Sequence, residues 1–356
     1  MAFVLLLYVA GVLVVSLTVG QYVWFGSALI LVPVVAAGLL ATPWTLAMGV
    51  LCTASLLGLY GFIEPSDEPL GDWLTIGSVA VVSVICVALA RVRAERNETL
   101  ARARVSLEVL QRALLPELPV VAPGARLDGF YAAAEAEARL GGDLYEVVES
   151  PYGIRVLIGD VQGKGLDAVG TGASVLAAFR EAGYYQPALE GVAERLENAV
   201  TRHHRRADRP DQQRFVTALL LELNGARAPG EGEMRMVSCG HVPPLLFGGP
   251  GDGPVREALM EEPGLPLGLA SLTRERRRAE GVALEGRRVL LCTDGVTEAR
   301  DAAGRFYPLA ERLSRWSREP APELLRALRA DLERHVGADL GDDAVVLVVT
   351  VEPGGA

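Results

Sequence analysis

The chain has 356 residues, a formal net charge of −10 at neutral pH and 50% hydrophobic residues. Its length suits two structural units. Its net negative charge disfavours non-specific binding to nucleic acid, so we expect no nucleic acid among its partners. The cysteines form no CxxC pair and lie in apolar stretches, which predicts buried free thiols rather than a disulfide framework or a zinc site. They stand at positions 52, 86, 239 and 292.

Residues 1–90 form an almost continuous apolar region without lysine or arginine. The acidic residues of this region are confined to Glu64, Asp67, Glu68 and Asp72. Because about 20 apolar residues cross a bilayer, the region predicts an all-α transmembrane bundle. We expect four passes, with three as the alternative, at about 3–19, 24–41, 44–62 and 74–90.

Arginines follow the last pass directly, at positions 91, 93 and 96. Positive charge marks the cytoplasmic side of a membrane. We therefore expect a multi-pass protein of the plasma membrane, in contact with the lipid bilayer, whose catalytic part is cytoplasmic. A transporter is disfavoured, because residues 1–62 contain no charged side chain that a substrate pathway would need.

Residues 91–118 are predicted to form a linking helix, since 91–115 lack glycine and proline and Pro116 ends the pattern. Apolar residues recur at spacings of three and four within residues 100–114. This short apolar stripe along one helix face, the dimer seam, predicts either a parallel homodimer or one helix that packs on its own domain.

Residues 119–356 carry a mixed pattern, with short apolar runs typical of strands and three longer helical patterns. The strands are expected near 126–133, 144–149, 154–159, 215–223, 234–239, 288–292 and 344–351. The helices are expected near 166–182, 188–206 and 321–335. Strands grouped without strict alternation with helices predict an α+β domain of antiparallel sheets covered by helices.

Four aspartates stand where a predicted strand meets a loop: Asp143, Asp160, Asp294 and Asp342. Strand ends can meet at one edge of a sheet, where several carboxylates would repel one another unless cations neutralise them. The ligands are all oxygen atoms, which favours Mg²⁺ or Mn²⁺ over zinc. Flanking glycines let the backbone approach a metal or phosphate, and two close metal ions suit phosphoryl chemistry. Each motif alone is more often an ordinary turn.

The chain resembles the bacterial serine phosphatases of the metal-dependent PPM/PP2C superfamily, in the branch of SpoIIE and RsbU. The resemblance runs from about 107 to 351. It rests on Gly-Gly-Asp-Leu-Tyr-Glu (141–146), Gly-Asp-Val-Gln-Gly-Lys-Gly (159–165), Gly-His-Val-Pro-Pro (240–244), Thr-Asp-Gly-Val-Thr-Glu (293–298) and Gly-Asp-Asp-Ala (341–344).

The resemblance implies an α/β/β/α sandwich with two Mn²⁺ or Mg²⁺ ions per active site. Asp143, Asp160, Asp294 and Asp342 would be catalytic metal ligands, and the carbonyl of Val161 would complete one site. Asp342 is chosen over Asp343 because the usual ligand of the family is the first residue of this pair. Two positions depart from relatives: Glu146 replaces a frequent aspartate, and Gln162 stands where some members have a histidine that protonates the leaving group.

The resemblance further implies a phosphoprotein substrate, namely an anti-anti-sigma factor of the STAS type in a partner-switching pathway. The alternative is a membrane sensor whose phosphatase-like domain only binds a partner; loss of metal ligands would mark that state. Lys164 is either structural or near the phosphate entrance. His241 either faces the metal site or braces the turn 240–244, and we favour the second.

Overall fold

The computed structural model describes residues 2–19, 28–60, 69–132, 142–206, 214–224, 233–249, 255–337 and 340–351. The chain divides into two compact units, Met1–Ala103 and Arg104–Ala356. The boundary falls within a helix of 46 residues, α5 (Pro69–Leu114). The sequence led us to expect a last membrane pass and a separate linking helix, whereas the backbone is one continuous helix.

Unit 1 is helical. Its other elements are α1 (Ala2–Val19), the 3-10 turn η1 (Ala28–Ile30), α3 (Leu31–Leu39) and α4 (Thr42–Gly58). Pro43 lies in the first turn of α4, where its missing N–H costs nothing. Buried residues such as Val9, Cys52 and Val79 form its apolar core.

Arg93 of α5 donates hydrogen bonds to two carbonyls at the end of α3, those of Gly38 and of Leu40, the latter at 2.8 Å. These carbonyls belong to the last turn of α3 and its C-cap, where carbonyls lack partners within the helix. The arginine that marked the cytoplasmic side in the sequence therefore also caps a neighbouring helix.

Unit 2 contains two antiparallel sheets. The first has the order β1 (Val120–Ala122), β2 (Ala125–Ala132), β11 (Ala344–Val351), β10 (Arg288–Cys292), β7 (Leu245–Phe247), β8 (Arg256–Glu257). The second has the order β3 (Leu144–Ser150), β4 (Gly153–Val161), β5 (Val216–Asn224), β6 (Glu233–Cys239), β9 (Glu280–Ala283).

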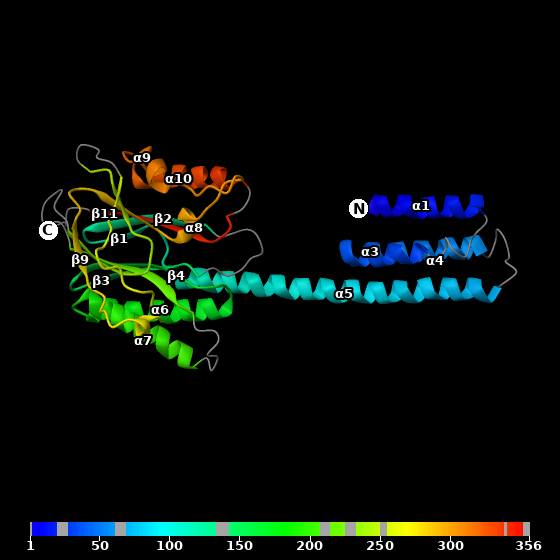
Figure 1. Ribbon diagram of the computed structural model, residues 1–356, viewed down its shortest axis with the longest axis horizontal. Coiled ribbons are helices and arrows are strands. Elements are labelled where there is room, and N and C mark those ends of the chain that lie inside the picture. Colours follow the sequence, from blue (N-terminus) through cyan, green and yellow to red (C-terminus); the bar gives the residue numbers. More distant parts are fainter. Residues whose placement is uncertain are drawn as a thin grey trace. The chain divides into compact units, whose positions relative to one another are not determined.

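Helices cover the outer face of each sheet (Figure 1). The second sheet carries α6 (Leu166–Tyr185) and α7 (Leu189–Arg206), and the first carries α8 (Asp294–Thr297), α9 (Leu309–Ser314) and α10 (Ala321–Val336). A short 3-10 turn, η4 (Ala270–Leu272), lies on the connection between β8 and β9. The layers therefore follow the α/β/β/α order that the family resemblance implies.

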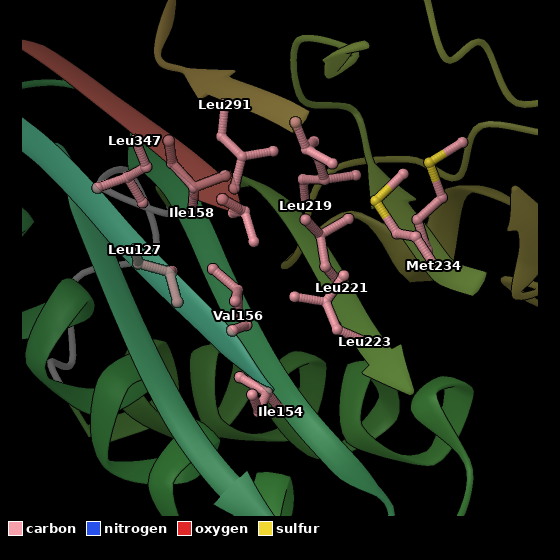
Figure 2. Close-up of a cluster of buried hydrophobic side chains, with 14 of the residues drawn as sticks. Leu127, Ile154, Val156, Ile158, Leu219, Leu221, Leu223, Met234, Leu291 and Leu347 are labelled. Atoms are coloured by element: carbon pink, nitrogen blue, oxygen red, sulfur yellow. The ribbon is translucent and has the colours of Figure 1, made fainter. Parts of the chain in front are cut away.

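The main core lies between the two sheets. Figure 2 shows Val156, Ile158 and Leu219 of the second sheet in one cluster with Leu291 and Leu347 of the first. Two further cores lie between each sheet and its helices. The core fixes the sheets against each other, so that loops from both can meet at one end.

Most predicted elements of this unit are confirmed, including all seven strands and the three long helices. The sequence missed the short strands β1, β7, β8 and β9 and the short helices α8 and α9. All four cysteines are buried and free, as predicted. The side chains of residues 100–113, which carry the predicted dimer seam, lie outside the described residues.

Candidate metal centre

Asp143 enters the site from the start of β3. Its side chain is buried, and the preceding Gly142 accepts a hydrogen bond from the backbone N–H of Val161 at 3.1 Å. A Cβ on Gly142 would lie 2.2 Å from the Val161 carbonyl oxygen and 2.4 Å from Asp160 Oδ1. Only glycine leaves room for the approach of these two loops.

Asp160 is the penultimate residue of β4, one position beyond Gly159, where the pairing with β3 ends, and it pairs with Thr217 of β5. Burial raises its pKa to about 7, with further contributions from the charges of Asp294 and Asp342, and a hydrogen bond with Asp143 works in the opposite direction. Burial also raises the pKa of Asp143 well above its usual range, and the charge of Asp160 adds to this effect.

Thr293 connects the two sheets at this end and was not identified from the sequence. Its buried hydroxyl donates to Asp143 Oδ2 at 2.7 Å and accepts from the Val345 N–H at 3.0 Å. Its partner Asp143 lies 150 positions earlier in the chain, so the local sequence around Thr293 carries no signal of this contact.

Asp294 lies two residues after the end of β10, where the sequence predicts a loop, and is instead the first residue of the short helix α8. Burial raises the pKa of Asp294, and the negative charges of Glu298 and Asp342 raise it further. The next residue, Gly295, packs directly against the loop before β11: a Cβ there would lie 1.8 Å from the Asp343 carbonyl oxygen. This contact brings the Asp294 loop and the Asp342 loop together.

Asp342 and Asp343 have different environments. The Asp342 side chain is 54% exposed and lies 2.8 Å from the ammonium of Lys164. Asp343 is buried and accepts a hydrogen bond from the Tyr131 hydroxyl, while its backbone N–H donates to Asp342 Oδ1 at 3.0 Å. Asp343 is thus anchored within the protein, whereas Asp342 faces outward with a displaceable partner.

These observations place the four predicted aspartates at one end of the sandwich. Each of the three inner carboxyls has a raised pKa through burial and neighbouring negative charge, which is the environment that a divalent cation relieves. Within the described part of the chain, no three acidic, histidine or cysteine side chains already stand in a metal-binding arrangement. Thr293 and Lys164 hold two of the carboxylates instead. The donor set, all oxygen, fits Mg²⁺ or Mn²⁺.

Two neighbouring residues support this end of the fold. His241 Nδ1 lies 3.0 Å from the hydroxyl of Thr217, and burial lowers the pKa of the imidazole to about 4, so it is neutral at physiological pH. Glu146 is buried and binds Arg180 of α6 at 2.6 Å. Arg180 also donates to the Leu114 carbonyl at 2.6 Å, which ties the end of α5 to the strand that begins beside Asp143.

A family model described as stage II sporulation protein E (SpoIIE) matches residues 150–352. Among solved structures, the chain is similar to the RsbU and RsbW domains of a Mycobacterium tuberculosis protein, with a TM-score of 0.52 and 22% identity over 67% of this chain and 62% of that chain. It is also similar to the SiaA PP2C domain of Pseudomonas aeruginosa, with a TM-score of 0.54 and 19% identity over 74% of this chain and 100% of that chain. At these identities, the structural likeness describes a shared fold.

Proposed function

The chain belongs to the SpoIIE family of PP2C-type serine/threonine phosphatases, and from this premise we propose that it is a membrane-anchored, metal-dependent enzyme acting on a phosphorylated regulatory protein. We assign residues 119–356 to the phosphatase domain, 91–118 to the linking helix and 1–90 to the membrane region. The observation that carries the proposal is the convergence of buried Asp143 with half-buried Asp160 and Asp294 at one end of the sandwich, where burial and neighbouring carboxylates raise the pKa of each.

The metal ligands in this proposal are Asp143, Asp160, Asp294, Asp342 and the carbonyl of Val161. Two bound Mn²⁺ or Mg²⁺ ions would activate the attacking water and stabilise negative charge on the transferring phosphoryl oxygens. The fit is supported by Gly142, because a side chain there would fill the space between the Val161 carbonyl and Asp160.

The protein itself contributes position and charge. Thr293 holds one Asp143 oxygen, which leaves the other oxygen to face the cluster. Gln162 cannot donate a proton as an acid, so the leaving serine oxygen takes its proton from water. His241, a neutral imidazole beside Thr217, braces the strand opposite Asp160 and has no acid role in this scheme.

The proposed substrate is a phosphoserine or phosphothreonine of a STAS-type anti-anti-sigma factor, in a partner-switching pathway. The similarity to a protein that combines RsbU and RsbW domains supports this choice. A domain that only binds a partner is the weaker alternative, since nothing would then maintain four aspartates in a cluster that costs folding free energy.

Membrane anchoring is supported by α5, in which Leu70–Thr99 is long and apolar enough to cross a bilayer. The described helices α1, α3 and α4 are apolar and shorter. Large apolar side chains of unit 1 are exposed, for example Phe3 at 71% and Val84 at 70%, as expected for a surface in contact with lipid. We propose several passes in the plasma membrane with the phosphatase domain in the cytoplasm.

The test of the substrate is a phosphoproteome comparison between cells that express the wild-type chain and cells that express Asp160→Asn. The proposal predicts that serine phosphorylation of a STAS-domain protein accumulates in the variant. An unchanged phosphorylation level of every such protein would refute the substrate assignment.

The proposed homodimer through residues 100–114 is tested separately by sedimentation of the full chain in detergent. A dimer supports the seam, and a strictly monomeric species at high concentration contradicts it.

A further inference from the structure

Lys164 is the only lysine among the 34 lysine and arginine residues of the chain. Every other basic side chain is an arginine, yet the one ammonium group lies beside the carboxylate cluster. Lysine differs from arginine in carrying a compact charge on a flexible stem, which can move between two partners without fixed planar geometry. The position of this residue therefore invites a functional explanation.

The backbone around Lys164 is held firmly. Gly163 and Gly165 have positive φ angles of 87° and 93°, which glycine alone adopts readily. The N–H of Gln162 donates to the Phe215 carbonyl at 2.9 Å, and Arg214 donates to the Gln162 carbonyl at 2.7 Å. The loop thus presents Lys164 at a fixed place next to β4, while the side chain itself remains 32% exposed.

The partner of Lys164 is a proposed metal ligand. Its ammonium lies 2.8 Å from Asp342 Oδ1, and Asp342 is the most exposed of the four aspartates. A cation bound by Asp342 would compete with the ammonium for the same oxygen. Lys164 would then lose its partner beside a site that receives a phosphate dianion, within the reach of one side chain.

We propose that Lys164 exchanges partners: it pairs with Asp342 in the metal-free protein and binds the phosphoryl group of the substrate once metal ions hold Asp342. This inference rests on the proposed function of the site. It gives Lys164 a role at the phosphate entrance, one of the two positions that the sequence left open for this residue. Arg214 is a poorer candidate, because its guanidinium is engaged with the Gln162 carbonyl of the same loop.

The first test measures Mn²⁺ binding and inorganic phosphate binding separately, by calorimetry on the full chain in detergent. We expect Lys164→Met to bind Mn²⁺ at least as tightly as wild type, because a competing cation is removed. Phosphate binding to the Mn²⁺-loaded variant should weaken by about tenfold or more, the usual effect of losing one charge-assisted hydrogen bond. Lys164→Arg, which retains the charge, should recover part of this affinity.

Unchanged phosphate binding in Lys164→Met would overturn the proposal. A parallel loss of Mn²⁺ and phosphate affinity would overturn it as well, because Lys164 would then only maintain the geometry of the cluster. If the wild-type chain binds Mn²⁺ but Lys164→Met keeps its phosphate affinity, this inference alone fails. If the wild-type chain binds no Mn²⁺, the proposed function fails as well.

The second test needs no variant. Since the chain has one lysine, acylation by an N-hydroxysuccinimide ester can be followed at a single ε-amine by peptide mass spectrometry. Inorganic phosphate should slow the acylation of Lys164 several-fold in the Mn²⁺-loaded wild type and have little effect in the chelated protein. Equal acylation rates with and without phosphate in the loaded protein would overturn the proposal.

Discussion

Asp160→Asn should stabilise the metal-free protein at neutral pH while removing its activity. Asp160 has a pKa of about 7 in the folded chain against an ordinary value of 3.8. This shift means that the ionised Asp160 destabilises the folded chain by at most about 4 kcal/mol, a cost that asparagine removes. Because Asp160 retains some contact with solvent, which screens its neighbours, we expect about half of that value.

The sign of the pH dependence follows from the raised pKa. Below about pH 4 the carboxyl is protonated in both the folded and the unfolded chain, and the wild type resembles the asparagine variant. As the pH rises from about 4 to about 7, the carboxyl is ionised in the unfolded chain but still largely protonated in the folded one, so the wild type loses stability that the variant keeps. The advantage of Asp160→Asn should therefore grow between pH 5 and pH 8.

The assay is scanning calorimetry of the full chain in detergent with a chelator, at pH 5 and pH 8. A gain of 1 kcal/mol raises the melting temperature of a domain of this size by roughly 2–4 °C. Asp167→Asn serves as the control, because Asp167 is an exposed aspartate on α6 with the same change of charge. If the melting temperatures of the wild type and Asp160→Asn change by the same amount between pH 5 and pH 8, the electrostatic argument is refuted.

Three further predictions test other parts of the account. Thr293→Val removes the donor to Asp143, which should cost about 1–3 kcal/mol of transition-state stabilisation and lower kcat by about 5- to 150-fold; an unchanged kcat would show that Thr293 does not orient the ligand. Gly142→Ala should weaken Mn²⁺ binding in calorimetry more than tenfold, whereas Gly77→Ala, which has open space for its Cβ, should not; equal affinities would contradict the proposed cradle. Alkaline carbonate should leave the full chain in the membrane pellet but release residues 104–356, and release of the full chain would contradict an integral anchor.

Much of unit 2 was predictable because its strands and helices are long and strongly patterned. The run Ala344–Val351 is almost wholly apolar, as expected for a strand buried on both faces, and it lies in the middle of the first sheet. The elements that escaped prediction are short. β8 has two exposed residues, and α8 has four residues whose start is fixed by contact with the loop of Asp343.

Sequence motifs predict candidate metal ligands but not the contacts that support them. Strand ends and glycine turns leave a local pattern, which predicts Asp143, Asp160, Asp294 and Asp342 as the ligands. Thr293 supports Asp143 across the two sheets, over 150 positions of sequence. Tyr131 supports Asp343 between the paired strands β2 and β11 of the first sheet, over 212 positions. Such contacts arise from sheet packing and leave no local pattern that a single sequence reveals.

The central claim is that the aspartate cluster makes this chain a metal-dependent protein phosphatase. Its most direct test is the initial rate of phosphate release from a serine-phosphorylated STAS-domain protein as Mn²⁺ is increased, for the wild type and for Asp160→Asn. The account predicts a rate that rises with Mn²⁺, disappears with a chelator and falls at least a hundredfold in the variant, while Asp167→Asn remains active. A rate that is independent of Mn²⁺, or an equal rate for Asp160→Asn, would contradict it.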